Sequence, residues 1–313
     1  MPNFRETRWI TSEDVNVEHL LDVFTTIDAN SDGVWDTCAH FMEHLVWHKK
    51  RLTTLAPKIK GLLDDHRSKP ECLFQLSRLF ESVGNIVERK QLLTRALTIW
   101  RERGSGHPVG RTLVELSGVN QVIGLHKEGI QQAKEASDIF ERLGDTASQA
   151  QCLIGLAHSL CLDKQFDAAE DSAFRAIALL PEKGEEFRVC ESHRALGIIC
   201  RFKGDIKKAV HYFEVAIGIA SSFNWHETLF CLHCETADLF RNGGRFDDAH
   251  NHIEHAKSHT AGNTYYLGCA MELQARVWYN QHRLEEAKSD ALRATDVYEK
   301  IGVMRILDRV RVR

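Results

Sequence analysis

Small residues recur at a fixed spacing over most of this chain. Successive members of three series lie 40, 40, 40, 40 and 38 residues apart. The first series comprises Ser77, Ser117, Ala157, Gly197, Ala237 and Ala275. The second comprises Arg89, Gly129, Ala169, Ala209, Ala249 and Ala287. The third comprises Ala96, Ala136, Ala176, Ala216, Ala256 and Ala294. Self-similarity at such a period predicts a stack of repeated supersecondary units.

Each unit is predicted to be a pair of helices joined by a tight turn. In residues 153–160 and again in 166–180, apolar residues recur three and four positions apart, which is the spacing of one helix face. Pro181 ends the second of these helices, because proline cannot continue the backbone hydrogen bonds. The turn position holds glycine in four units: Gly84, Gly124, Gly204 and Gly244. Two residues later a large apolar side chain returns in five of the six units, with His126 as the exception.

The small residues have a packing function. A small side chain at a helix crossing lets two helices approach to about 8–10 Å. One helix pair cannot bury its apolar face, so neighbouring pairs must stack, and the stack presents a long surface. We therefore predict an all-α solenoid of six helix-turn-helix repeats, and a binding protein rather than an enzyme.

The register of the units carries a family resemblance. A small residue at the eighth position and alanine at the twentieth and twenty-seventh resemble the tetratricopeptide repeat (TPR) over residues 70–302. The 40-residue step resembles the long-repeat branch of that family, because the usual unit has about 34 residues. The position of the usual tryptophan holds Leu73, Leu113, Leu153, His193, His233 and Met271. The resemblance implies that the first helix of each unit lines a concave groove.

Three segments carry a closer resemblance. Residues 41–50, 70–80 and 218–226 look like the C-terminal TPR region of basidiomycete fungal NB-ARC or NACHT ATPases, the STAND NTPases. In that family the repeats follow a nucleotide-binding motor, for which a chain that begins at Met1 leaves no room. The resemblance implies a sensor or scaffold half that exists alone.

Composition narrows the remaining function classes. A net charge of −4 gives no argument for a nucleic-acid partner, and no apolar run approaches the about 20 residues of a membrane span. Nine scattered cysteines are typical of reduced thiols, which indicates the cytoplasm. Residues 1–69 are predicted to be a helical cap or domain remnant, and residues 303–313 a basic capping tail.

One loop resembles a calcium site. Positions 1, 3, 5, 6 and 9 of such a loop are matched by Asp28, Asn30, Asp32, Gly33 and Asp36. The twelfth position is Ala39, where calcium needs a bidentate glutamate. We interpret residues 28–36 as a turn and predict no calcium binding.

Other metal and cofactor patterns are incomplete. Cys231 and Cys234 have the C-x-x-C spacing of a zinc site, but the chain offers no second such pair. His252, His255 and His259 share one helix face, which could hold a transition metal, although in other units the position of His259 is apolar. Residues 104–112 faintly resemble a phosphate loop but are predicted to be an inter-repeat loop. We predict no catalytic site and no cofactor.

The predicted binding surface is the groove along the first helices. Its candidate residues are Phe74, Arg78, Arg111, Ile154, His158, Arg194, Ile198, Arg201, Asp238, Arg241, Arg276 and Tyr279. Arginine forks bind carboxylates through two hydrogen bonds, so we expect an acidic peptide or protein segment as the partner. Alternatively, these charges pair with one another and solvate the helix face. A small-molecule sensor and a metal- or calcium-regulated adaptor are the other two candidate functions.

Overall fold

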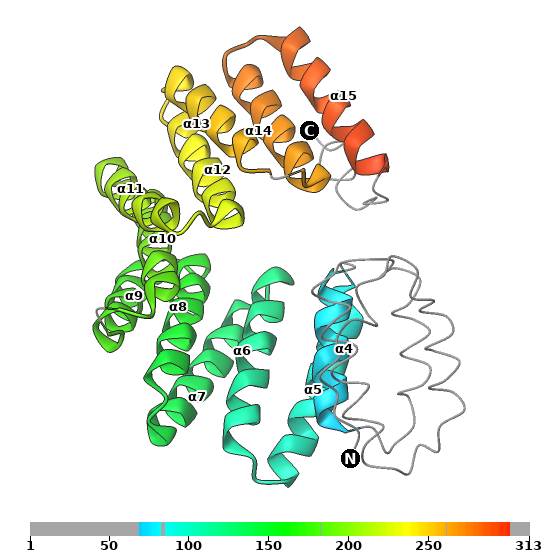
Figure 1. Ribbon diagram of the computed structural model, residues 1–313, viewed down its shortest axis with the longest axis vertical. Helices are drawn as coiled ribbons and strands as arrows, with labels where there is room; N and C mark the ends of the chain where they lie inside the picture. Colours follow the sequence, from blue (N-terminus) through cyan, green and yellow to red (C-terminus); the bar gives the residue numbers. More distant parts are fainter. Residues whose placement is uncertain (1–68, 83–84, 182, 261, 301–313) are drawn as a thin grey trace. The chain divides into compact units, whose positions relative to one another are not determined.

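The structure is a computed structural model that describes residues 69–82, 85–181, 183–260 and 262–300. Within these residues the chain forms twelve α-helices and no strand (Figure 1). The first six are α4 (Pro70–Ser82), α5 (Ile86–Glu102), α6 (Gly106–Val122), α7 (His126–Leu143), α8 (Thr146–Leu162) and α9 (Phe166–Leu179). The other six are α10 (Glu186–Lys203), α11 (Ile206–Ser222), α12 (His226–Asn242), α13 (Phe246–Ser258), α14 (Thr264–Asn280) and α15 (Leu284–Lys300). The predicted fold class is confirmed.

Several predictions fall on other parts of the chain. The calcium-like loop at 28–36, the rest of the segment 1–68, the turn at Gly84 and the tail 303–313 lie outside the described residues. Among the helices that are described, none has both the length and the apolar character needed to cross a bilayer.

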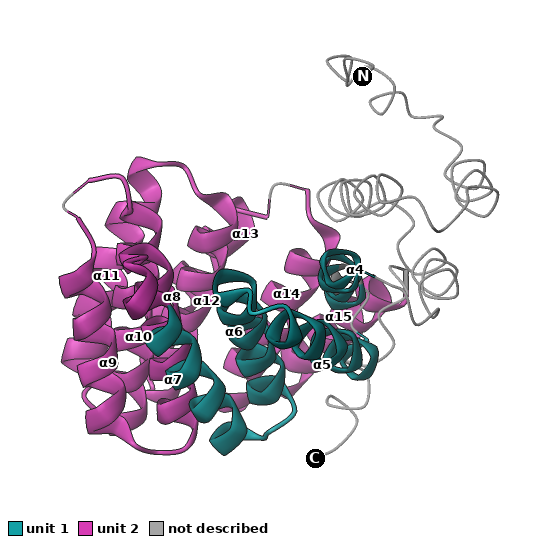
Figure 2. Cartoon of the chain, turned by 90° about the horizontal axis from the view of Figure 1, so that it is seen from below, with its two compact units in different colours: residues 1–139 teal, residues 140–313 magenta. Residues whose placement is uncertain are grey.

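The helix contacts divide the chain into two compact units, residues 1–139 and 140–313 (Figure 2). In the first unit, α4 pairs with α5, and α5 packs against α6. In the second unit the hairpins are α8–α9, α10–α11, α12–α13 and α14–α15. There α10 also lies against α8 and α12, and α12 lies against α14, so the first helices of successive hairpins are neighbours.

Every member of the three series of small residues is buried. The Ser117 hydroxyl donates to the carbonyl of Gly129 at 2.9 Å, which brings the first and second series of one repeat into contact. Arg89 is the large exception in the second series. Its guanidinium lies 2.9 Å from Glu81 and 2.5 Å from Glu115, so one buried cation joins α4, α5 and α6.

Gly197 stands where the five other units have serine or alanine at a helix crossing. A Cβ atom added at Gly197 would lie 2.6 Å from ring carbons of Phe213. Phe213 is fully buried and belongs to the core cluster of α10–α12. The missing side chain at 197 therefore makes room for the large ring at 213.

The turns repeat with the helices. Gly124, Gly204 and Gly244 have φ of +83°, +82° and +72°. Lys164 and His282 occupy the same position in two other units and have φ of +62° and +61°. The turn imposes the left-handed conformation even where the sequence lacks glycine.

A second set of turns joins one unit to the next. Its positive-φ residues are Gly104, Gly144, Gly184, Asn224 and Gly262. Their spacing is visible in the sequence, although the prediction did not use it. The predicted loop at 104–112 is too long, because α6 already begins at Gly106 and accepts Pro108 in its first turn.

Helix ends follow local sequence signals. The residues after the intra-repeat turn, such as Phe166 and Ile206, are the first residues of the second helices. The side chains of Asn85 and Asp205 accept hydrogen bonds from backbone N–H groups three residues on, as N-caps do. Helix α9 ends at Leu179, two residues before Pro181, as predicted.

Candidate functional site

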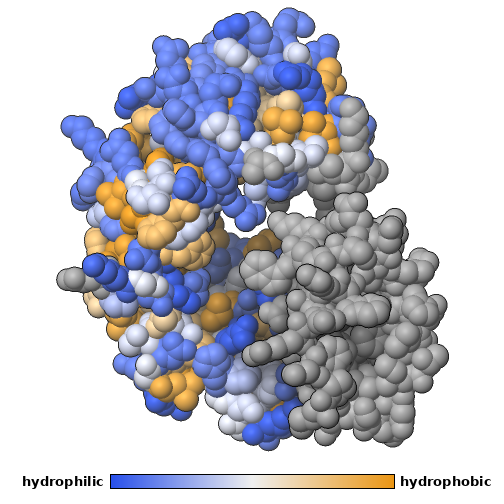
Figure 3. All heavy atoms as spheres, viewed as in Figure 1, coloured by the Kyte–Doolittle hydropathy of each residue, from blue (hydrophilic) through white to orange (hydrophobic). Residues whose placement is uncertain are grey.

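The second unit contains a pocket formed by α10, α12 and α14, with a volume of 360 Å³. Its lining residues are Arg194, Arg201, Phe230, Cys231, Cys234, Glu235, Asp238, Cys269, Glu272, Leu273 and Arg276. All of them lie on the first helices of their hairpins, which are the helices predicted to line the groove. Figure 3 shows that hydrophilic residues dominate the described atoms on the face of the molecule drawn there.

Asp238 gathers three arginines in this region. Its Oδ2 atom lies 3.1 Å from Arg201 Nη1. Its Oδ1 atom lies 2.8 Å from Arg241 Nη2 and 3.3 Å from Arg276 Nη2. The side chain of Arg241 is 11% exposed, whereas that of Arg276 is 52% exposed. Of the three arginines, Arg276 is therefore exposed to solvent, whereas Arg241 is largely buried and holds the Asp238 carboxylate in place.

Arg194 pairs with carboxylates of the protein itself. It lies 3.0 Å from Glu191 and 2.7 Å from Glu235, and its side chain is 25% exposed. Burial disfavours the charged guanidinium, but the carboxylates of Glu235 and Glu191 outweigh burial and raise the pKa of Arg194. At this position the alternative interpretation holds: the charges of the groove pair with one another.

His158 lies on α8, the neighbouring first helix. Burial, and next the positive charge of Arg194, lower its pKa to about 4. Its Nε2 atom is buried and has no hydrogen-bond partner among the described residues. The imidazole of His158 is therefore neutral at pH 7, and it is not one of the residues that line the pocket.

The other predicted groove residues are distributed unevenly. Ile154 is 2% exposed and belongs to the core, so it offers no anchor to a partner. Ile198 is half-buried against the core cluster of its own hairpin. Tyr279 is 65% exposed on α14.

The remaining three predicted groove residues belong to the first unit. There the Arg111 guanidinium lies 5.1 Å from the centre of the Phe74 ring, and Phe74 itself is buried. Arg78, on α4, is half-buried. The structure therefore brings together Arg194, Arg201, Asp238, Arg241 and Arg276 in the second unit, and separately pairs Phe74 with Arg111 in the first.

Three thiols also face the pocket: Cys231, Cys234 and Cys269. Burial is the largest effect on each and raises their pKa values, that of Cys231 to about 11. Protonated thiols behave as small apolar side chains. Together with the buried side chains of Phe230 and Leu273 they form the apolar part of the pocket lining.

Cys231 and Cys234 do not form a single site with His233, which lies between them in the sequence. Cys231 and Cys234 face the pocket with α10 and α14, whereas His233 contacts the histidines of α13. His226 and His233 join His252, His255 and His259, and the sequence interpretation missed this inter-helix cluster. The signal that could have found it is the seven-residue spacing of His226 and His233, which puts both on one face of α12.

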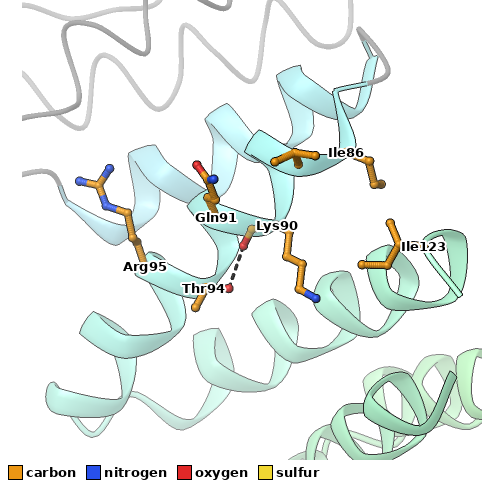
Figure 4. Close-up of a pocket in the computed structure, with 7 residues that line it drawn as sticks. Ile86, Lys90, Gln91, Thr94, Arg95 and Ile123 are labelled. Atoms are coloured by element: carbon orange, nitrogen blue, oxygen red, sulfur yellow. Dashed lines mark hydrogen bonds between the residues drawn. The ribbon is translucent and has the colours of Figure 1, made fainter. Parts of the chain in front are cut away.

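The first unit has a separate pocket of 590 Å³ on α5, lined by Ile86, Val87, Lys90, Gln91, Thr94, Arg95 and Ile123 (Figure 4). Thr94 Oγ1 donates to the backbone carbonyl of Lys90 at 2.8 Å, so this hydroxyl is used within the helix. The volume of this pocket suits a small ligand. Arg95 points away from Lys90 and Ile123 in Figure 4, so the polar groups do not converge on one point.

No protein-family model matches this chain. No curated protein matches it either. Solved structures do match. A Rap protein complexed with competence and sporulation factor is 14% identical with a TM-score of 0.65, over 91% of this chain and 92% of that one.

Two further structures extend the comparison. Aspartyl phosphate phosphatase F from Bacillus subtilis is 12% identical with a TM-score of 0.59, over 90% of this chain and 87% of that one. In the APC/C hetero-tetramer Cut9–Hcn1, the matching chain is 14% identical with a TM-score of 0.56, over 90% of this chain and 52% of that one. These likenesses show the fold: the chain is a TPR-like helical repeat protein.

Proposed function

We propose that this chain is a protein–protein interaction module, and that the groove over α10, α12 and α14 binds an extended partner segment through an acidic side chain. The observation that carries the proposal is the arrangement around Asp238. Three guanidinium groups surround one carboxylate, which leaves a local excess of two positive charges. A partner carboxylate between Arg201 and Arg276 would offset this excess with charge-assisted hydrogen bonds.

The excess is local to Asp238, because over the wider pocket the carboxylates of Glu191, Glu235 and Glu272 outnumber Arg194 and balance it. Glu191 and Glu235 already pair with Arg194. Glu272 accepts a hydrogen bond from Tyr298 at 3.3 Å. The side chain of Arg201 contacts Asp238 through Nη1, and that of Arg276 through Nη2, so both guanidinium groups keep further N–H donors for a ligand.

The comparisons support a binding role. Proteins of this fold have been solved in complex with a competence and sporulation factor and in a hetero-tetramer with a second protein. The resemblance to the repeat region of fungal STAND ATPases favours a sensor or scaffold of the cytoplasm.

The test is a selection of displayed random peptides against the full chain. We expect the selected peptides to be enriched in aspartate and glutamate. The double substitution Arg201→Gln with Arg276→Gln should weaken their binding by about tenfold or more, because a hydrogen bond to a charged group contributes about 1.5–3 kcal/mol. Glutamine is chosen over glutamate so that no like charge is placed beside Asp238.

Arg293→Gln is the matched control. Arg293 pairs with Asp290 on α15 and its side chain is 64% exposed, so this substitution also removes one surface arginine of an ion pair. It should leave peptide binding unchanged. Peptides without acidic residues, or acidic peptides that bind the double variant as well as the parent, would contradict the proposed site.

A further inference from the structure

Five histidines form a cluster between two helices of the second unit. His226 and His233 come from α12, and His252, His255 and His259 come from α13. His233 is 8% exposed and occupies the centre. Its ring centre lies 5.1 Å from that of His255, 5.2 Å from that of His252 and 5.7 Å from that of His259.

Two nitrogen–nitrogen distances in this histidine cluster are short. His233 Nδ1 lies 3.0 Å from His252 Nδ1, and His226 Nδ1 lies 3.2 Å from His259 Nδ1. In a tetrahedral zinc site with Zn–N bonds of about 2.0–2.1 Å, ligand nitrogens lie about 3.3 Å apart and imidazole centres about 5 Å apart. The spacing of the His252 and His255 rings from His233 is thus close to that of rings that share one ion, whereas these two rings lie 6.3 Å from each other.

We propose that His233, His252 and His255 bind a divalent transition-metal ion of the zinc class. Imidazole nitrogens suit zinc, copper and nickel, and the spacing of His252 and His255 puts both on one face of α13. The site lies on the α13 side of α12, whereas the peptide groove lies on the α10 and α14 side. It is therefore independent of the proposed partner groove.

The protonation state of the cluster fits this chemistry. Burial, followed by the neighbouring His252, His255 and His259, lowers the pKa of His233 to about 3. Burial and then His255 lower the pKa of His252, against a smaller opposite effect of Asp248. Both rings are thus neutral at pH 7, which is the form that binds metals.

The third ligand has to move. Among the described residues, no three potential ligands are placed so that they could hold an ion as the side chains stand. His233 and His252 face each other through Nδ1, and His255 is exposed on the open side of the cluster. The proposed site therefore requires the His255 side chain to rotate until a ring nitrogen reaches an ion between His233 and His252.

The test is a calorimetric titration of the full chain with zinc chloride at pH 7, repeated with cobalt chloride and visible absorption. We expect saturable binding of one ion with micromolar or tighter affinity, and a cobalt spectrum of nitrogen coordination. His252→Gln with His255→Gln should weaken binding by more than the about 10–100-fold that loss of an outer-shell partner costs. His211→Gln, an exposed histidine of α11, is the control and should bind zinc like the parent.

Three results would overturn the proposal. The first is a lack of saturable binding in the parent, which would mean that the short contacts are N–H···N hydrogen bonds alone. The second is unchanged binding in the double variant. The third is a thiolate–cobalt charge-transfer band, which would place the ion on cysteines instead. Because His252 and His255 are not part of the core, circular dichroism of the double variant should match that of the parent.

Discussion

At the scale of single residues, His158 makes the folded state sensitive to acid. Its folded pKa of about 4 is lower than the about 6.5 of an unfolded chain. The unfolded state therefore binds the proton more tightly, so the stability is complete above about pH 6.5 and falls as the pH drops toward 4. We expect the loss to reach about 2–3 kcal/mol, measured by urea unfolding across this range.

His158→Leu removes this titration and should make the stability of the second unit less dependent on pH between 6.5 and 4. His282→Asn is the control, because His282 is exposed and asparagine tolerates its positive φ. An identical pH dependence for His158→Leu and the parent would show that His158 titrates normally.

The burial of residues that follow the repeat could be predicted from the sequence. The contacts of residues that depart from the repeat could not. The buried alanines at 176 and 216 follow from their spacing, because the register fixes which helix face each occupies. The ion pairs of Arg89 join three helices and depend on side-chain conformations that the spacing does not determine. That Glu235 is a partner of Arg194 could not be predicted for the same reason, since 41 residues separate the two.

At the scale of the elements, the turn position makes a prediction about Lys164. This residue has φ of +62°, a conformation that disfavours side chains with a Cβ atom. Lys164→Gly removes that strain of about 1–2 kcal/mol but gives the unfolded chain more entropy, which costs about 0.4–1 kcal/mol. We expect a net stabilisation of about 0.5–1 kcal/mol in thermal unfolding.

The reciprocal change provides the control. Gly204 occupies the same position in the next unit with φ of +82°, so Gly204→Ala should destabilise the protein by about 1 kcal/mol. If both substitutions shift the melting temperature in the same direction, the turn conformation does not determine the effect.

The elements themselves were the most predictable part of the molecule. Helix starts such as Phe166 and Ile206, and the helix end before Pro181, have local signals that act within one turn of helix. The predicted loop at 104–112 failed because Gly104, Gly106 and Pro108 suggested a loop. Two of these residues are compatible with the start of a helix.

At the scale of the whole molecule, the architecture couples each helix mainly to its neighbours. Helix α10 packs against α8, α9, α11 and α12, and α14 packs against α12, α13 and α15. In such repeat arrays the stability is approximately a sum of unit and nearest-neighbour terms. The candidate site also depends on several helices at once. The sequence register indicated that the first helices line a groove, but it could not show that arginines from three of these helices meet at Asp238.

Gly197→Ala tests this local coupling. The added Cβ would lie 2.6 Å from the buried ring of Phe213. Overpacking costs about 1–3 kcal/mol, whereas alanine gains about 1 kcal/mol over glycine in a helix, so the crossing should lose about 1 kcal/mol. Gly218→Ala is the control, because a Cβ at this exposed position of α11 meets no atom within 4 Å and should stabilise the helix by about 1 kcal/mol.

Amide hydrogen exchange of Gly197→Ala then shows how far the destabilisation spreads from α10 to the other helices. In a chain of nearest-neighbour contacts, protection should fall most in α10 and α11, less in α8, α9 and α12, and not at all in α15. Gly218→Ala should raise protection in α11. An equal loss of protection from α8 to α15 in Gly197→Ala would instead mean that the second unit unfolds as one cooperative body. The groove at Asp238 could then not be altered without effects on all of its helices.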